Sequence, residues 1–215
     1  MEALTTNIRE EDTICIFLSL ISNYFSLFSI NIFSTGVSMK LYSISDNYIS
    51  YLREEFPRVY SNKEKARIHT RKYLGVVITM NNYNYYIPLS SPKIRHDYID
   101  VDGKKEIRKS SLIVIRIVSN EPKGKELKGT LQIGTMIPVP SSELIEYDID
   151  SEEDLNYKNL VWKEMQFIRK NEKLIIENAK NLYNKKITGS EEKIVKNCLD
   201  FKAIERRCDS WEGQK

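Results

Sequence analysis

Two strand-like runs joined by Asn81-Asn82 constrain the fold of this chain more than any other feature. Tyr73 to Met80 is rich in β-branched residues and is typical of a buried strand. Tyr83 to Ile87 follows directly after the two asparagines, a residue type that favours tight turns. The pattern predicts a β-hairpin and therefore a sheet with antiparallel strands.

Strand patterns fill the first part of the chain. Further strands are predicted at Lys40 to Ile44, Leu112 to Val118 and Thr130 to Val139. A short helix with Ser45 as its N-cap is predicted at Asp46 to Glu55. The connections between the strands are hairpins, loops or short helices, which favours an antiparallel sheet over a doubly wound parallel one.

Helical patterns fill the second part of the chain. They begin with a short helix at Ser142 to Tyr147. A long helix capped by Ser151 or Asp150 is predicted through about Lys185, with Leu174 among the apolar positions at helical spacing. A last helix is predicted from Ser190 to about Arg207. Strands followed by helices predict an α+β fold.

The segment from Pro88 to His96 carries residues suited to chemistry on a phosphodiester. It follows the second strand of the hairpin, and Pro88 and Pro92 are expected to bracket the point where the chain leaves the sheet. Its polar residues are Ser90, Ser91, Lys93, Arg95 and His96. Hydroxyls and cations together can hold a phosphate and move protons. No Gly-rich phosphate loop or acidic metal cluster lies nearby in the sequence, so we expect a site without a metal or cofactor.

Each of these residues also has a purely structural interpretation. Ser90 and Ser91 are frequent turn residues, and Lys93 and His96 are ordinary surface residues. The tyrosines of the hairpin can stack on unpaired bases, but alternation along a strand predicts core and rim positions for them instead. These tyrosines are Tyr83, Tyr85 and Tyr86.

The charge and the cysteine content favour an intracellular protein that binds a polyanion. The net charge is +3, and three cysteines without regular spacing suggest reduced thiols in the cytoplasm. A basic stretch runs from Lys63 to Lys72, and Arg67, Arg71 and Lys72 within it are candidate contacts to RNA phosphates. The alternative is that this stretch is a solvated surface.

Residues 1–38 differ from the rest of the chain. Ile14 to Phe33 approaches the length of a membrane-spanning helix, but serines and asparagines interrupt it and an acidic segment precedes it. We expect translation to start at Met39, with residues 39–215 forming one domain of charge +6. A membrane anchor is the alternative, and we expect no membrane association.

Four segments match one known family in the same order. They are Met39 to Ser45 followed by Tyr48, Tyr73 to Val76, Pro88 to Lys93 and Trp162 to Arg169. Through these segments the chain resembles the ToxN/AbiQ toxins of type III toxin–antitoxin systems over most of residues 39–185. The family typically begins where Met39 stands, and residues 1–38 have no counterpart in it.

The resemblance implies a fold and a function. Members resemble the Kid/MazF fold, a strongly twisted, barrel-like antiparallel sheet with helices around it. They are metal-independent endoribonucleases that attack through the ribose 2′-OH. Each is held inactive by a small pseudoknot-like antitoxin RNA, which the toxin processes from a repeat transcript, in a ring-like assembly of protein and RNA. Release of the toxin stops growth and aborts phage infection. The expected partners are therefore this antitoxin RNA and cellular RNA substrates.

The resemblance also assigns roles to residues. Ser91 takes the position of the family's key hydroxyl, with Ser90 beside it, and Lys93 takes that of its lysine. Tyr48 takes the position of the family's tyrosine and is expected to help at the catalytic site, by holding the region of the 2′-hydroxyl or by stacking. Arg71 stands near a position where some members carry a lysine, and arginine is a poor proton donor or acceptor.

The alternative function is an RNA-binding module without catalysis. The same cations and tyrosines would serve binding alone, and the sequence does not separate binding from cleavage. Cleavage that depends on Ser91 and Lys93 would distinguish the two.

Overall fold

The computed structural model describes residues 39–62 and 69–213. The predicted extension of residues 1–38 lies outside the described residues, and so does Arg67. Within the described ranges, no helix combines the length and the apolar composition needed to span a bilayer.

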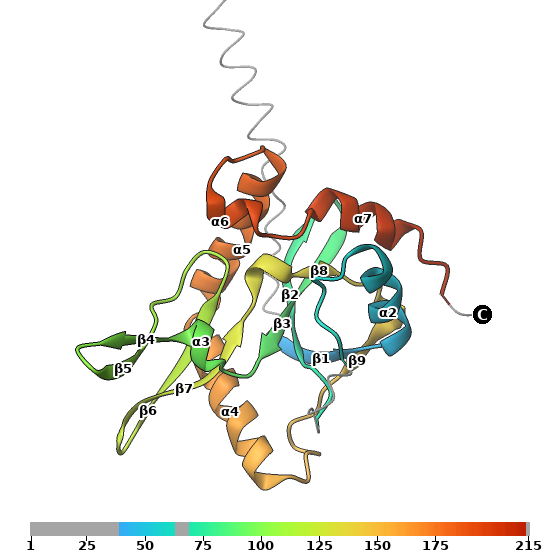
Figure 1. Cartoon of the computed structure of the whole chain (residues 1–215). Helices are drawn as coiled ribbons and strands as arrows, with labels where there is room; N and C mark the ends of the chain where they lie inside the picture. Colours follow the sequence, from blue (N-terminus) through green and yellow to red (C-terminus); the bar gives the residue numbers. More distant parts are fainter. Residues whose placement is uncertain (1–38, 63–68, 214–215) are drawn as a thin grey trace, which may run out of the picture. The chain divides into compact units, whose positions relative to one another are not determined.

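An antiparallel sheet forms the centre of the fold (Figure 1). Its strands are β1 (Lys40–Ile44), β2 (Tyr73–Met80), β3 (Tyr83–Ser90), β6 (Ile115–Glu121), β7 (Gly124–Leu131), β8 (Ile137–Pro138) and β9 (Leu144–Glu146). In the described residues the pairing order is β6-β7-β3-β2-β1-β9, and β8 pairs with β3 aside from this path. The predicted α+β class with a large antiparallel sheet is confirmed.

The hairpin that motivated this prediction forms as expected. Met80 pairs with Tyr83 across the turn, and the intervening Asn81 and Asn82 have φ angles of 49° and 68°. Asparagine tolerates this left-handed backbone better than most residues. The two asparagines therefore set the register of β2 against β3.

Strand β3 is longer than predicted. It continues through Pro88 to Ser90, so the expectation that Pro88 marks the exit from the sheet was wrong. On one side, β3 pairs with β8 at Tyr85 and Tyr86 but with β7 at Leu89 and Ser90. Pro88 lies where this partner changes, and there a strand tolerates a residue without an N–H.

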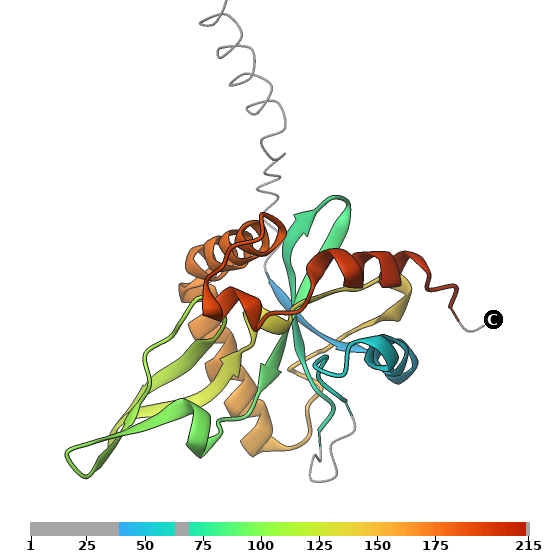
Figure 2. The same cartoon turned by 45° about the horizontal axis from the view of Figure 1, so that its top comes forward.

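Two hairpins project from the sheet beside one another (Figures 1 and 2). One consists of β6 and β7, and the other of β4 (Tyr98–Val101) and β5 (Lys104–Ile107), with the predicted turn at Asp102 and Gly103 between β4 and β5. The segment between Ile107 and Ile115 connects the two hairpins. Basic residues of this segment and of β6 and β7 line one pocket.

Several predicted strand limits were wrong. The strand expected at Leu112 to Val118 starts at Ile115, because Ser111 and Val114 bridge a turn before it. The strand expected at Thr130 to Val139 is divided: β7 ends at Leu131, and the 3-10 turn η1 (Ile133–Thr135) precedes β8. The short helix expected after Ser142 is instead the 3-10 turn η2 (Ser141–Glu143) followed by β9.

The first helix agrees with its prediction. Helix α2 spans Asp46–Glu55, and the Ser45 side chain accepts a hydrogen bond from the backbone N–H of Tyr48 at 3.2 Å. The hydroxyl thereby satisfies one of the N–H groups left free at a helix N-terminus.

The later helices are shorter than predicted. They are α4 (Leu155–Lys170), α5 (Glu172–Ile187), α6 (Lys193–Lys196) and α7 (Phe201–Asp209). Asn171 interrupts the predicted long helix, and Leu174 after it is 46% exposed rather than buried. Asp200 caps α7 through the N–H of Ala203 and divides the predicted last helix. Helix α4 lies against β6 and β7, and α5 against β2.

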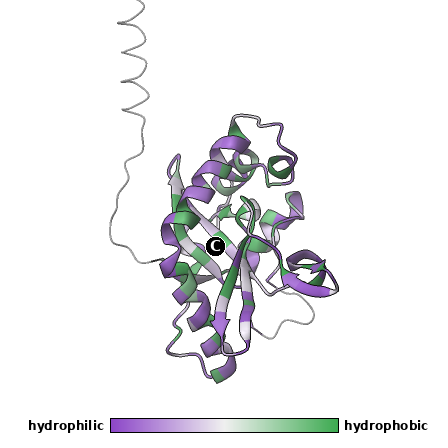
Figure 3. Cartoon of the chain, turned by 90° about the vertical axis from the view of Figure 1, so that its left-hand side faces the viewer, coloured by the Kyte–Doolittle hydropathy of each residue, from purple (hydrophilic) through white to green (hydrophobic). Residues whose placement is uncertain are grey.

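Buried aromatic residues and one carboxylate join the sheet to the last helices. Tyr85 on β3 and Tyr183 on α5 both donate hydrogen bonds to Oε1 of Glu205 on α7, at 2.8 and 2.6 Å. All three residues are buried. Figure 3 shows hydrophobic colouring on the central strands and hydrophilic colouring on the projecting hairpin. The core therefore lies between sheet and helices.

Glu164 on α4 predicts an unusual dependence of stability on pH. It is 8% exposed, and burial raises its pKa from 4.5 to about 8. The folded protein therefore binds a proton that the unfolded chain releases between these values, so this group lowers stability as pH rises toward 8. Glu164→Gln should make the protein more stable than wild type at about pH 9, by about 1.4 kcal/mol for each pKa unit, with little difference near about pH 4. Urea unfolding across this range measures it, and parallel curves for both proteins would contradict the assignment.

Candidate active site

The candidate site lies where β3 leaves the sheet. Ser90 is the last residue of β3, and Lys93 precedes the short helix α3 (Ile94–Asp97). The backbone N–H of Lys93 donates a hydrogen bond to Oδ2 of Asp97 at 2.8 Å. This bond fixes the backbone from which the Lys93 side chain extends.

Four predicted residues line one pocket here. They are Ser90, Ser91, Lys93 and His96. The pocket has a volume of about 370 Å³, and we call it the strand-exit pocket. Its other lining residues are Tyr60, Asp97, Ser111, Ile113, Val114, Arg116 and Gln132. Ser91, Lys93 and His96 are exposed, so a ligand in the pocket can reach them.

Ser90 differs from Ser91 in exposure. Ser90 is 5% exposed, and its carbonyl accepts a hydrogen bond from Oγ1 of Thr130 on β7 at 3.2 Å. Its hydroxyl donates weakly to the carbonyl of Ser91, at 3.5 Å. Ser90 thus anchors the exit to β7, while Ser91 presents its side chain to solvent.

A buried ion pair forms part of the pocket wall. Nη2 of Arg116 on β6 lies 3.1 Å from Oδ1 of Asp97, and both side chains are less than a tenth exposed. The same guanidinium donates to the carbonyl oxygens of His96 at 2.9 Å and Lys109 at 2.7 Å. Arg116 therefore ties helix α3 to the sheet, and Asp97 passes this constraint on to Lys93.

Arg71 supports the exit without lining the pocket. Its side chain is fully buried, and it donates hydrogen bonds to the carbonyl oxygens of Leu89 at 2.7 Å and Ser61 at 3.2 Å. Its guanidinium carbon lies 4.3 Å from the centre of the Tyr60 ring, and Nζ of Lys93 lies 5.9 Å from the same centre. Both the buried arginine and the exposed lysine therefore lie near the Tyr60 ring.

Two predicted site residues lie away from this pocket. Tyr48 is fully buried, and its hydroxyl donates to the carbonyl of Pro138 at 2.8 Å. Burial raises the pKa of Tyr48 above its ordinary value. Lys72 is 9% exposed and its ammonium lies 3.9 Å from the centre of the Tyr147 ring, where burial lowers its pKa. Neither residue lines the strand-exit pocket.

Arg95 lies on the same helix as His96 and is exposed, but it does not line the pocket. Within the described ranges, no group of three or more His, Cys, Asp and Glu residues is arranged to hold a metal ion. The chemistry on offer at this site comes from hydroxyls, an ammonium and an imidazole. Such groups can orient a phosphate, stabilise added negative charge and transfer protons.

Sequence reasoning missed the pocket residues outside the segment Pro88 to His96, and the ones that support Lys93 are Tyr60, Asp97 and Arg116. Arg116 carried a usable signal, because it interrupts an apolar run of strand residues and a charge in such a position needs a buried partner. Asp97 follows Lys93 by four residues, which is the spacing of one helical turn. No local pattern marked Tyr60.

A protein-family model matches residues 40–209, and it is described as the toxin ToxN of type III toxin–antitoxin systems. Among individual relatives, an endoribonuclease ToxN of Bacillus thuringiensis subsp. kurstaki is 29% identical, covering 80% of this chain and 84% of the relative. An endoribonuclease ToxN of Pectobacterium atrosepticum is 28% identical, covering 70% of this chain and 83% of the relative. An endoribonuclease AbiQ of Lactococcus lactis subsp. lactis is 29% identical, covering 80% of this chain and 88% of the relative.

Solved structures give the same picture. A type III toxin described with selective inhibition by a non-coding RNA pseudoknot has a TM-score of 0.66 and 28% identity, covering 82% of this chain and 99% of that one. A structure from an antiviral system regulated by a processed non-coding RNA has a TM-score of 0.68 and 26% identity, over 81% and 99%. The lactococcal AbiQ structure shares the fold, with a TM-score of 0.64 and 24% identity over 80% and 96%.

Proposed function

Because the chain belongs to the ToxN family of toxins from type III toxin–antitoxin systems, we propose that it is an endoribonuclease whose active site is the strand-exit pocket. Its relatives are named as endoribonucleases. The observation that carries the assignment of the site is that Ser91, Lys93 and His96 open into one pocket at the end of β3. We assign the activity to residues 39–215, which contain the whole family match.

The proposed reaction uses the ribose of the substrate as its own nucleophile. The 2′-oxygen loses its proton and attacks the adjacent phosphorus, which forms a phosphorane. The bond to the 5′-oxygen then breaks, and that oxygen takes up a proton. The products are a 2′,3′-cyclic phosphate and a 5′-hydroxyl, and the reaction requires charge stabilisation and two proton transfers.

The lining residues match these requirements. The Lys93 ammonium stabilises the charge of the phosphorane, and Ser91 orients the phosphate with Ser90 behind it. Lys93 and His96 are the lining side chains suited to exchange protons with the substrate. We give Tyr48 a structural role instead of the predicted catalytic one, because its side chain is buried and its hydroxyl donates to the carbonyl of Pro138.

The proposed partners are RNA molecules of two kinds. Cellular RNA is the substrate, which places the active protein in the cytoplasm. A structured antitoxin RNA inhibits the toxin and forms a ring-like assembly with it. The descriptions of two structural relatives, one inhibited by an RNA pseudoknot and one regulated by a processed non-coding RNA, support this partner. Arg95 and His96 are exposed on α3 at the pocket and are suited to contact either RNA.

The experiment that tests this function measures binding and cleavage of the same RNA. Purified protein should cut a long RNA in the presence of EDTA. Ser91→Ala should cut it at least about 10-fold more slowly. The loss of one donor to the developing negative charge can slow a reaction by up to about 10²–10³-fold. Ser141→Ala, another exposed serine outside the pocket, is the matched control and should cut at the wild-type rate. Wild-type protein that binds RNA but leaves it intact would support the non-catalytic RNA-binding module instead.

A further inference from the structure

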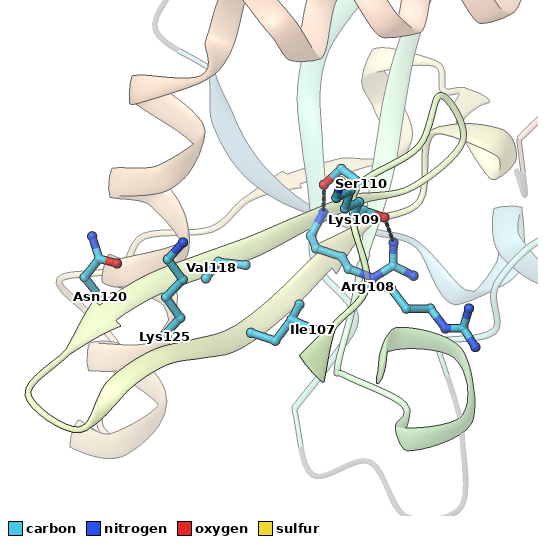
Figure 4. A pocket seen from close by; sticks show the side chains of 8 residues that line it. Ile107, Arg108, Lys109, Ser110, Val118, Asn120 and Lys125 are labelled. Atoms are coloured by element: carbon cyan, nitrogen blue, oxygen red, sulfur yellow. Dashed lines mark hydrogen bonds between the residues drawn. The ribbon is translucent and has the colours of Figure 1, made fainter. Parts of the chain in front are cut away.

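A second pocket lies beside the strand-exit pocket, between the two projecting hairpins (Figure 4). It has a volume of about 370 Å³, and we call it the hairpin groove. Its lining residues are Ile107, Arg108, Lys109, Ser110, Arg116, Val118, Asn120 and Lys125. Four of these residues are cations and none is acidic.

The cations of the groove are available to an anion. Arg108, Lys109 and Lys125 are exposed, and within residues 39–62 and 69–213 neither Lys109 nor Lys125 has an ion-pair partner. The nearby Glu121 on β6 instead binds Lys128 and Lys163, which lowers its pKa to about 2. Arg116 is paired with Asp97, so the positive charge that the groove offers to an anion comes from Arg108, Lys109 and Lys125.

The groove is joined structurally to the strand-exit pocket. Arg116 lines both, and its Nη1 donates to the carbonyl of Lys109 while its backbone N–H donates to Oγ of Ser110 at 2.9 Å. The backbone N–H of Arg108 donates to the carbonyl of Asp97 at 2.9 Å. These bonds fix the basic wall of the groove against the helix that carries His96.

Acidic residues line another pocket. Glu146, Asp148, Glu152 and Glu153 line a hollow of about 490 Å³ that has no basic lining residue. A polyanion is repelled there and attracted to the hairpin groove, because potentials focus in clefts lined by one sign of charge. Of these two hollows, the hairpin groove is therefore the more favourable for RNA that extends from the strand-exit pocket.

We propose that the hairpin groove binds backbone phosphates of the single-stranded RNA next to the scissile link. This rests on the proposed function, since it treats the strand-exit pocket as the place of cleavage. Lys109, Lys125 and Arg108 contact phosphate oxygens, and the Ser110 hydroxyl and Asn120 amide contact the sugar. Ile107 and Val118 provide apolar contact for the ribose. The groove reads the backbone and so adds affinity without choosing a base.

The test measures binding of a 15-nucleotide oligouridylate with 2′-O-methyl riboses, which lacks the attacking hydroxyl. In Lys109→Ala/Lys125→Ala, affinity should fall about tenfold, and the slope of log affinity against log salt should fall by about 1.4, at about 0.7 for each single-strand phosphate. Lys104→Ala/Lys105→Ala removes the same charge from exposed positions of β5 outside the groove and is the matched control. Equal losses in both double variants would overturn the site.

Two further comparisons separate this proposal from the proposed function. Lys93→Ala should keep most of the slope of log affinity against log salt, because the hairpin groove is intact in this variant. If wild-type protein never cuts RNA while the groove variant still loses its salt slope, the nuclease assignment fails and the groove stands. Lys109→Ala/Lys125→Ala could bind the single strand normally but lose affinity for an RNA hairpin duplex of similar length. The occupant of the groove would then be structured RNA, and the proposed single-strand site would be wrong. Thermal melting must show that each variant is folded.

Discussion

Lys93→Ala is expected to slow RNA cleavage by about 10²–10³-fold while the protein remains folded. Lys93 is exposed at the strand-exit pocket, so removing its side chain leaves no buried cavity. The loss falls on the phosphorane, which carries more negative charge than the bound substrate, and removing one stabilising group from such a transition state has this magnitude. Single-turnover rates at saturating protein measure the effect on the chemical step.

Two other variants show what kind of role Lys93 has. Lys93→Arg keeps the charge but removes a group that exchanges protons readily, so a partial rescue indicates an electrostatic role. Lys104→Ala removes an exposed lysine outside the pocket and should leave the rate unchanged. A folded Lys93→Ala protein that cuts at the wild-type rate would move the active site elsewhere.

Arg116→Met is expected to destabilise the protein by about 3–5 kcal/mol, because it leaves the Asp97 carboxylate buried without its partner. It also removes the two hydrogen bonds that connect the His96 and Lys109 carbonyls to β6. Urea unfolding at neutral pH measures the loss. A change below about 1 kcal/mol would mean that the pair is exposed to water, since surface pairs have that value.

A double replacement separates stability from positioning in this cluster. Arg116→Met/Asp97→Leu should recover much of the lost stability, because two apolar residues can replace a buried ion pair at little cost. Cleavage by the double variant should be slower than cleavage by wild type, since the backbone N–H of Lys93 has lost its acceptor. Recovery of both stability and rate would show that Asp97 and Arg116 do not position Lys93.

The hairpin and the first helix were predictable because short-range chemistry decides them. Asn81 and Asn82 accept a left-handed backbone, and Ser45 caps α2, so the local sequence selects the structure. The strand between Thr130 and Val139 was not predictable in this way. The break at η1 is held by distant parts of the chain, because the N–H of Gly134 donates to the carbonyl of Ile113 at 3.0 Å and the carbonyl of Gly134 accepts from the N–H of Leu199 at 3.0 Å.

The candidate site was predictable only in its continuous segment. Ser90, Ser91, Lys93 and His96 are close in the sequence, and the structure gathers them in one pocket. The supporting residues come from elsewhere in the chain, Arg116 from β6 and Arg71 from the segment before β2, and no local pattern connects them to Lys93. The predicted family is confirmed by the family model that matches residues 40–209.

The most direct test of the account is cleavage of one RNA that carries a single 2′-deoxyribose at its mapped cleavage site. If the strand-exit pocket uses the substrate's own 2′-hydroxyl, this RNA should bind as the unmodified RNA does and should not be cut at that site. The unmodified RNA should yield a 2′,3′-cyclic phosphate and a 5′-hydroxyl. Cutting of the deoxy-substituted link at the unmodified rate would contradict the account, because the attacking oxygen would then have to come from elsewhere.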